Sequence, residues 1–490
     1  MTISRRSLIS SIVAGTAASA ALAATSAKAA GLCSIPAKWD QTWDVIVIGA
    51  GGAGLAAGIT AKEAGVKTII LEKMPFPGGN TMVSGGGMNA AVEADYKAAG
   101  VEDSPKLHAE QTLAAGDNRA DPALVKILAE GAPQSVEWLK KIGVHFRPGI
   151  YQIYGGLWPR CRNPEGQSGS DYIKAGVEYA KKIGLEILTG HKVTRIIREE
   201  PNAGRVLGVE VEVGGKTQNW RALKGVVAAA GGYAADAKMC AFFDPRLEKL
   251  NTTNQPCSTG EVLRAIQDIN GLAVGMDYIQ CIPWTAPGYK NVADVFQAIE
   301  FTIFVNKEGK RYVAEDNRRD VIRDATLAQT DQTVYQVTDV VGFEENNKFY
   351  NEMNHAALKN GTLFEANTIE ELAKKVSLPA DVLKKTVDDY NAMVDSKKDP
   401  LGRTAKMLSH KIAKAPFYIG PFGMCRHHTM GGARIDTQAR VLDREGNVIP
   451  GLYAAGEVTG GIHGTNRVGG NAIADIFTFG RIAGKSAAEG

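Results

Sequence analysis

The sequence predicts an α/β fold in which a nucleotide-binding domain, split along the chain, encloses an inserted α+β domain. Three features predict this fold: a glycine-rich βαβ unit near the N-terminus, a charge-rich helical stretch in the middle, and a return to glycine-rich strands at the end. The expected boundaries place the first part of the split domain at 31–276, the inserted domain at 277–410 and the closing part at 411–490. A chain of 490 residues is long enough for such domains and a large core.

The βαβ unit carries the strongest signal. Residues 44–72 read DVIVIGAGGAGLAAGITAKEAGVKTIILE, a buried strand, a glycine-rich turn, a helix and a second strand. We expect Gly49 to make the tight turn, Gly51 to let the backbone approach a pyrophosphate, and Gly54 to let helix and strand pack closely. Glu72 follows Gly54 by 18 residues, where an acid accepts hydrogen bonds from a ribose. The unit predicts dinucleotide binding but does not distinguish FAD from NAD.

Further elements follow from periodicity and from turn residues. The predicted strands are 185–188, 193–197, 206–213 and 225–230, and the predicted helices are 121–142, 261–270, 368–376 and 380–396. The segment 451–457, GLYAAGE, reads as a strand far from the first βαβ unit, as expected where a split domain closes. Gly469, Gly470 and Asn471 then open a final apolar helix.

Composition narrows the possible partners. Apolar residues make up 44% of the chain and charged residues 22%, as in an ordinary globular protein. The net charge of +3 is supplied by Arg5, Arg6 and Lys28, so the rest of the chain is close to neutral. No basic patch favours nucleic acid as a partner.

The N-terminal stretch resembles an export signal. Residues 1–30 contain Arg5-Arg6, an alanine-rich run and an A-x-A site that predicts cleavage near Ala29. This pattern is typical of twin-arginine export, which carries folded proteins to the periplasm. The alternative is a chance arginine pair before a membrane anchor. No other segment approaches 18 uninterrupted apolar residues, so no stable membrane insertion is expected.

Cysteine usage argues against a metal centre. The six cysteines are scattered and form no CxxC or CxxCH motif, so no metal site and no c-type haem is expected. We expect most of these thiols to be unpaired.

Several long motifs in order identify a family. GAGGAG, EKMPFPGGNT, SGGGMNAA, NKEGKRYVAEDNRRD, HHTMGG and PGLYAAGEVTGGIHGTNRVGGNA resemble the flavoprotein of fumarate reductase and succinate dehydrogenase. The resemblance covers residues 43–488 and is closest to the soluble periplasmic branch that includes flavocytochrome c fumarate reductase and urocanate reductase. It implies a split FAD-binding domain, an inserted capping domain and an active site between them.

The resemblance implies FAD as the cofactor. Its histidine for covalent attachment is missing from Asn80-Thr81-Met82-Val83-Ser84, so FAD is expected to be non-covalent. Together with the βαβ unit it predicts these cofactor-binding residues: Gly49, Gly51, Gly52, Ala53, Gly54, Glu72, Lys73, Gly79, Asn80, Thr81, Gly86, Gly87, Val193, Ala230, Gly231, Glu457, Arg467, Gly470, Ala472 and Ile473.

The implied reaction moves a hydride from flavin N5 to an activated C=C bond, while a proton goes to the neighbouring carbon. By resemblance, His427 and Arg467 grip the substrate carboxylate, as suits an imidazole and a guanidinium fork. Arg319 is the implied proton donor, a role that chemistry alone would not assign because a free guanidinium holds its proton. Arg318 is the neighbouring alternative, and His428 is expected to be structural.

Departures from the family pattern concern the far end of the substrate. Ile282 stands where the fumarate enzymes have a histidine, and the segment 291–297, NVADVFQ, lacks their Thr-Glu-x-x-Arg. Asp294 is expected to replace the relay glutamate. Trp284 and Tyr154 add aromatic walls, and Gly87 is the remaining predicted substrate contact.

A second carboxylate against apolar groups would be costly to bury. The sequence therefore predicts a reductase of a mono-carboxylate enoate with an apolar or aromatic tail, of the acrylate or cinnamate type. Electrons are expected from a separate exported c-type cytochrome. The alternatives are a divergent fumarate reductase whose apolar residues simply pack the core, a flavin dehydrogenase running in the oxidising direction, and an exported electron carrier.

Overall fold

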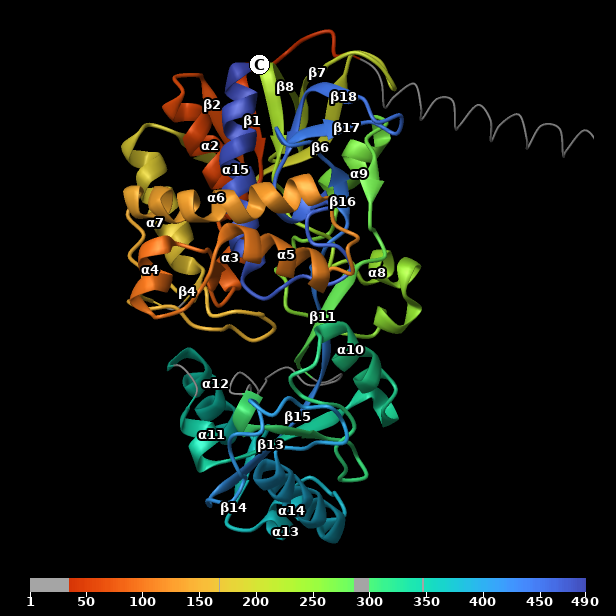
Figure 1. Ribbon diagram of the computed structural model, residues 1–490. Helices are drawn as coiled ribbons and strands as arrows, with labels where there is room; N and C mark the ends of the chain where they lie inside the picture. The colour runs from red at the N-terminus through yellow and green to blue at the C-terminus, as the bar shows by residue number, and fades with distance from the viewer. Residues whose placement is uncertain (1–34, 167, 286–298, 346–347) are drawn as a thin grey trace, which may run out of the picture.

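A computed structural model describes residues 35–166, 168–285, 299–345 and 348–490. Figure 1 shows a larger body that holds the first strands and the last helix, and a smaller body formed mainly from the middle of the chain. The larger body has one extensive hydrophobic core, and the smaller body adds a second around Leu372, Leu383 and Ile419.

A mixed sheet forms the centre of the larger body. Its main path runs β17-β18-β8-β1-β2-β5, and β6 and β7 continue from β8. Strands β1, β2, β5, β8 and β18 pair in parallel, which confirms the predicted α/β fold. The strands are β1 (Gln41–Ile48), β2 (Thr68–Leu71), β5 (Glu186–Leu188), β6 (His191–Arg198), β7 (Val206–Val213), β8 (Lys216–Ala228), β17 (Arg440–Leu442) and β18 (Val448–Ala454).

Helices from both ends of the chain cover this sheet. The first helix of the βαβ unit, α2 (Gly52–Glu63), packs against the last helix, α15 (Asn471–Glu489), so the two ends of the chain share one core (Figure 1). The other helices of this body are α3 (Gly79–Val83), α4 (Glu93–Ala98), α5 (Pro105–Ala115), α6 (Pro122–Lys141), α7 (Ser170–Lys182), α8 (Ala237–Phe243) and α9 (Glu261–Asp268).

The long helix α6 shows how local sequence sets an element. Asp121 caps it by accepting a hydrogen bond from the Ala123 amide at 2.8 Å, and Pro122 occupies the first helical position. Lys140 and Lys141 lie in its last turn, where positive charges interact favourably with the negative end of the helix dipole. The helix predicted at 121–142 is thereby confirmed.

A second sheet runs from the smaller body to the larger one. Its path is β11-β15-β13-β12, with β14 and β9 also paired to β15. The strands are β9 (Asn251–Thr252), β11 (Ile279–Trp284), β12 (Ile303–Val305), β13 (Val334–Asp339), β14 (Phe364–Ala366) and β15 (Phe417–Thr429). The inserted domain was predicted to end at residue 410, yet β15 follows that residue and pairs with β13. The two bodies therefore share this sheet. The domain boundaries stay a prediction.

Helices and short elements complete the chain. The helices of the smaller body are α10 (Arg319–Leu327), α11 (Val340–Glu344), α12 (Lys348–Lys359), α13 (Ile369–Lys375) and α14 (Ala380–Ser396). Short strands are β3 (Met88–Asn89), β4 (Cys161–Arg162), β10 (Ala273–Val274), β16 (Gly432–Arg434) and β19 (Thr459–Gly460). The 3₁₀ turns are Pro245–Leu247, Ile299–Phe301, Thr330–Gln332 and Gly456–Val458.

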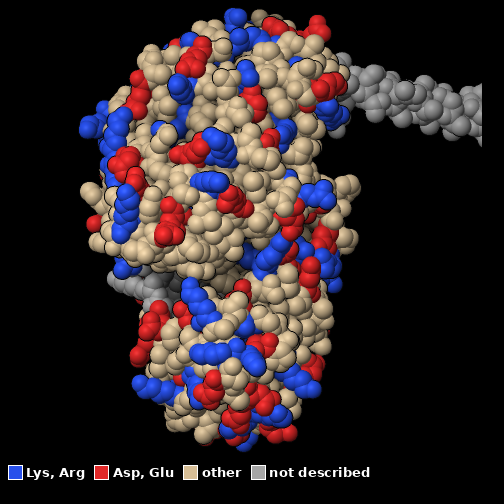
Figure 2. Space-filling view, in the orientation of Figure 1, with Lys and Arg blue, Asp and Glu red and all other residues tan. Residues whose placement is uncertain are grey.

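The surface shown in Figure 2 carries acidic and basic side chains interspersed, without a field of one sign, and is hollowed where the two bodies meet. Within the described ranges, no helix is both long and apolar enough to cross a membrane. Over the same ranges, no three His, Cys, Asp or Glu side chains gather as metal ligands. The described cysteines are free: Cys161, Cys240, Cys257, Cys281 and Cys425.

Candidate active site

The glycines of the βαβ unit have distinct steric roles. Gly49 has a φ of +102°, and a Cβ atom there would lie 2.5 Å from the Ala229 carbonyl oxygen. A Cβ atom on Gly54 would overlap the carbonyl oxygen of Gly49, so Gly54 is required for helix–strand packing. A Cβ atom on Gly51 would meet nothing closer than Gly78, 3.8 Å away. The protein fold leaves the space at Gly51 open, as a pyrophosphate cradle requires.

A cavity follows these turns along the carboxyl ends of the sheet strands. It measures about 890 Å³ including its open side. Predicted cofactor residues that line it are Gly49, Gly51, Gly52, Ala53, Glu72, Lys73, Gly79, Asn80, Thr81, Val193, Ala230, Gly231 and Glu457. Gly54 lies outside the lining because its role is packing. His191, Cys257, Ser258 and Glu261 also line the cavity and were missed, since they lie outside any recognisable motif.

Glu72 is held in place by backbone amides. Its two carboxylate oxygens accept hydrogen bonds from the amides of Ala50 at 2.8 Å and Met74 at 2.9 Å. Each carboxylate oxygen has a further lone pair for a ribose hydroxyl. Lys73 next to it pairs with Glu261 at 2.5 Å. The open Gly51 turn, the helix N-terminus and this acid suit the phosphates and ribose of a dinucleotide.

A second cavity continues from the first. It measures about 1510 Å³ including its opening, and both cavities are lined by Asn80, Thr81, Glu457 and Ile476. Predicted residues in its lining are Gly86, Gly87, Tyr154, Ile282, Trp284, Arg319, His427, Arg467, Gly470, Ala472 and Ile473. Arginines, histidines and apolar side chains from distant segments thus face one space.

Gln280 joins two guanidinium groups and was missed at the sequence level. Its Oε1 accepts hydrogen bonds from Arg319 Nη1 and Arg467 Nη2, both at 2.9 Å. Its Nε2 donates to Asn466 Oδ1 at 3.1 Å and to the Arg467 carbonyl at 2.9 Å, which fixes the amide orientation. The available signal was a single polar residue in the buried run Ile279–Trp284.

Arg467 is short of acceptors. Its Nε is buried without a hydrogen-bond partner, and within the described residues no carboxylate forms an ion pair with it. Burial, followed by the nearby charge of Arg319, lowers the pKa of Arg467 to about 9. An anion in this cavity would offset both the unpaired Nε donor and the cost of burying the positive charge, because it would pair with the desolvated guanidinium.

Arg318 and Arg319 point to different partners. Arg319 begins α10 and is 8% exposed; its Nη2 donates to the Tyr154 carbonyl at 3.0 Å. Arg318 instead pairs with Asp117 at 2.6 Å and with Asp320 at 2.9 Å. The geometry therefore brings Arg319, and not Arg318, together with the predicted carboxylate grip. Asp294, the predicted relay acid, lies outside the described residues.

A bulge in β15 turns two histidines to the cavity. Gln280 pairs with His428 and Cys281 with Arg426, so His427 is the extra residue of the bulge. Burial, and then the charges of Arg467 and Arg319, lower the pKa of His427 well below its usual value. The imidazole is therefore neutral at neutral pH.

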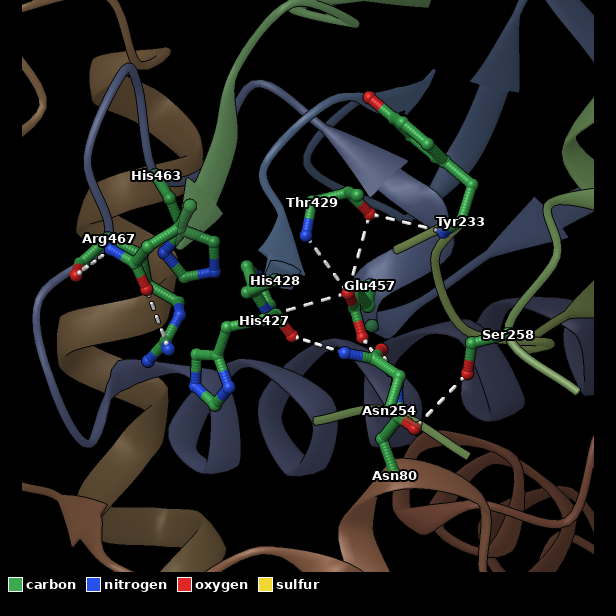
Figure 3. Close-up of polar contacts among 12 residues, drawn as sticks. Asn80, Tyr233, Asn254, Ser258, His427, His428, Thr429, Glu457, His463 and Arg467 are labelled. Carbon is green, nitrogen blue, oxygen red and sulfur yellow. Dashed lines mark hydrogen bonds and ion pairs between the residues drawn. The ribbon is translucent and has the colours of Figure 1, made fainter. Parts of the chain in front are cut away.

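His428, expected to be structural, also lines the cavity. Its Nδ1 lies 3.7 Å from Glu457 Oε1 (Figure 3). Glu457 accepts a hydrogen bond from the Thr429 amide at 3.0 Å and one from Asn80 Nδ2 at 3.2 Å. Burial raises the pKa of the Glu457 carboxyl. This network joins the cofactor cavity to the end of the second cavity that holds Arg319 and Arg467, which we call the cationic end.

The part of the lining that β11 contributes beyond Gln280 is apolar. Gln280, Ile282 and Trp284 are alternate residues of β11, so they share one face, and the last two line the cavity. Trp284 is four residues along the strand from Gln280, an advance of about 13 Å, so it stands well away from the guanidinium groups that Gln280 holds. The Tyr154 ring centroid lies 5.4 Å from the Arg319 guanidinium carbon.

This geometry defines a flavoprotein class, and comparison with known proteins agrees. Residues 44–473 match the family model described as FAD binding domain. The chain belongs to this FAD-binding family and, within it, to the soluble fumarate reductase-like branch. The protein binds FAD and is an oxidoreductase that acts on CH–CH groups.

Two relatives and one solved structure show the extent of the match. Fumarate reductase (cytochrome) of Shewanella frigidimarina is 36% identical over 468 residues, which are 95% of this chain and 80% of that protein. NADH:acrylate oxidoreductase of Vibrio harveyi is 34% identical, over 92% of this chain and 51% of that protein. The open conformation of a flavocytochrome c3 fumarate reductase superposes with a TM-score of 0.77, 34% identity and coverage of 92% and 79%.

Proposed function

We propose that this protein reduces the C=C bond of an α,β-unsaturated mono-carboxylate with an apolar or aromatic tail. The observation that carries the proposal is the polarity of the second cavity. One end of this cavity holds Arg319, Arg467 and His427. Further along, on the strand that leads away from them, the cavity is lined by Ile282 and Trp284. One carboxylate has cationic partners there, and a second would be desolvated against apolar side chains.

Each residue at the cationic end has a proposed task. Arg467 and His427 hold the substrate carboxylate, since Arg467 has an unused buried donor and His427 lies beside it. Their charge and hydrogen bonds draw electron density from the C=C bond. When bound, FAD supplies the hydride from its N5 atom.

Arg319 is the proposed proton donor. Its guanidinium is fixed by Gln280 and by the Tyr154 carbonyl, and it lines the same cavity. A proton held at a fixed Nη atom can reach the carbon next to the one that accepts the hydride. The repulsion between the two guanidinium groups that share Gln280 favours release of this proton.

Cofactor attachment, location and electron supply are part of the proposal. FAD is held non-covalently, because Asn80 and its neighbours offer no histidine at the position where covalent relatives attach it. The twin-arginine pattern within residues 1–30 directs the folded protein to the periplasm. A separate c-type cytochrome supplies electrons, since the chain has no CxxCH motif while the name of its Shewanella relative includes a cytochrome.

A substrate panel tests the proposal. Reduced methyl viologen would supply electrons to the FAD-loaded protein, and fumarate, urocanate, methacrylate, cinnamate and caffeate would be compared by kcat/KM. We expect an alkyl or aryl acrylate to exceed fumarate. Fumarate as the best substrate would contradict the assignment of Ile282 and Trp284 to a pocket for the substrate tail, called the tail pocket, and would favour a divergent fumarate reductase.

Two further assays separate enoate reduction from acid oxidation and from simple electron transfer. A dehydrogenase would oxidise saturated acids with an artificial acceptor faster than it reduces the corresponding enoates. A pure electron carrier would exchange electrons with a cytochrome but would turn over no acid in the panel.

A further inference from the structure

A short segment on the edge of β15 secures the bulged histidine. Strand β9 pairs with Cys425 and Arg426, immediately before the bulge at His427. The Thr253 amide continues this pairing by donating to the Arg426 carbonyl at 3.0 Å. The next residue, Asn254, donates from Nδ2 to the His427 carbonyl at 2.7 Å (Figure 3). The backbone of His427, which the sheet leaves unpaired on this side, is thereby fixed.

The side chain of Thr253 then meets the imidazole itself. Thr253 Oγ1 lies 2.8 Å from His427 Nδ1, and both residues line the second cavity. A neutral imidazole has one N–H donor and one acceptor nitrogen, and its hydrogen-bond partner selects which is which. A hydroxyl can donate to Nδ1, and the proton of the imidazole then resides on Nε2.

We propose that Thr253 is a positioning residue that holds His427 in the Nε2–H tautomer, so that the neutral imidazole donates a hydrogen bond to the substrate carboxylate. This inference rests on the proposed function, because it names how one part of the carboxylate grip works. In the other tautomer, Nε2 would present a lone pair to the carboxylate and repel it. In the proposed arrangement the threonine hydroxyl donates to Nδ1, and this nitrogen then carries no proton.

The charges around His427 explain why the tautomer matters. The groups that face it are Arg319 on α10, Arg467 before α15, and His428 on β15 itself. Burial, together with the positive charge of the two arginines, keeps the imidazole neutral, so it cannot bind an anion simply by being protonated. A neutral imidazole contributes to the grip only if the correct nitrogen carries the proton.

Binding of a saturated acid tests this role without turnover. The probe is 3-phenylpropionate, titrated into FAD-loaded protein and followed through the flavin absorbance spectrum. Thr253→Val removes the hydroxyl at nearly constant size, and Thr253→Ser retains it. Thr252→Val is the matched control for the structure of the segment, since the Thr252 hydroxyl donates to the Arg426 carbonyl and accepts from the Asn254 amide, both at 3.1 Å, and does not touch the imidazole.

We expect Thr253→Val to raise the Kd at pH 8 by roughly tenfold, the usual scale for a hydrogen bond to a charged group. Thr253→Ser and Thr252→Val should stay within about twofold of the unmodified protein, a difference small on that scale. The defect of Thr253→Val should persist as the pH falls towards 5.5, because burial and the two arginines lower the pKa of His427 well below its usual value.

The possible failures are distinguishable. A Thr253→Val protein that binds like the unmodified one at both pH values overturns the tautomer role and leaves the proposed function intact. Equal losses in Thr253→Val and Thr252→Val also overturn it, since they indicate a structural effect of the segment. Absence of binding in the unmodified protein contradicts the proposed function itself.

Discussion

The two connected cavities are built in different ways. The part of the cofactor cavity next to the βαβ unit is formed by one stretch of sequence, in which Gly51 leaves space, Gly49 turns the chain and Glu72 closes the unit. The second cavity is formed by side chains from β11, β15, α10 and the loop before α15. A backbone cradle can be identified in a sequence because local geometry demands particular residues. A cluster of side chains becomes visible only when the fold brings it together.

The difference also appears in the energetics. The cofactor cavity satisfies its own groups, as the two amide bonds to the Glu72 carboxylate show. The second cavity holds two guanidinium groups on one amide oxygen and a buried Arg467 Nε without a partner. The protein accepts unfavourable electrostatics where an anion binds, and substitutions in each cavity should therefore have different consequences.

The largest effect is expected from Arg319→Ala. Loss of a positioned general acid should lower kcat for enoate reduction by about 10²–10⁴-fold. Arg318→Ala is the matched control and should change kcat little, because Arg318 pairs with Asp117 and Asp320. Steady-state turnover with reduced viologen measures both. Equal losses in the two variants would remove Arg319 from its assigned role.

Two glycine substitutions separate packing from cofactor binding. Gly54→Ala should destabilise the fold by about 1–3 kcal/mol with or without FAD, because its Cβ would overlap the Gly49 carbonyl. Gly51→Ala should leave the FAD-free protein unchanged in thermal unfolding and weaken FAD binding, since only the cofactor would meet its Cβ. If Gly51→Ala lowered stability without FAD, the cradle would have a structural purpose instead.

Helix α15 contributes to both cavities through Ile476, and a buried histidine of α5 that contacts its first residue gives a pH test. His108 Nε2 lies 2.9 Å from Asn471 Oδ1, and burial lowers its pKa to about 4. Between pH 6.5 and 4 the unfolded chain binds a proton at His108 that the folded chain excludes. As the pH is lowered through this range, this group should therefore decrease the free energy of unfolding by ~1.4 kcal/mol per pH unit.

His108→Gln should remove that slope. Denaturant unfolding between pH 7 and 4.5 would show a pH dependence reduced by about one proton relative to the unmodified protein. The other histidines remain in both proteins, so the comparison isolates His108. Parallel pH profiles would show that His108 is protonated in the folded state.

The smallest effect concerns the tail pocket. Trp284→Ala should lower kcat/KM for an aryl acrylate about tenfold, since it removes an aromatic contact, while acrylate itself should change little. Turnover of the two substrates by one preparation gives the ratio directly. A uniform loss on both substrates would indicate that Trp284 supports the strand and not the substrate tail.

The sequence predicted elements with clear periodicity or turn signals. Strand β7 and helix α14 coincide with their predicted ranges, and the predicted strand 225–230 overlaps the end of the longer β8. Strand β15 was not predicted, because Gly420, Pro421 and Gly423 interrupt any alternation and its partners come from distant segments. Tertiary pairing overrides local preference there.

The same limit applies to the site. His427, Arg319 and Arg467 were found through motifs, and the structure brings them to one cavity. Gln280 and Thr253 were not found, because a glutamine in a strand and a threonine in a loop have no distinctive spacing. Their importance depends on a bulge and on a shared acceptor, which exist only in three dimensions.

The most direct test of the central claim is a crystal structure of the FAD-loaded protein with 3-phenylpropionate. We expect the carboxylate within hydrogen-bonding distance of Arg467 and His427, and the phenyl ring against Ile282 and Trp284. A carboxylate bound away from the two arginines, or a phenyl ring directed out of the cavity, would contradict it.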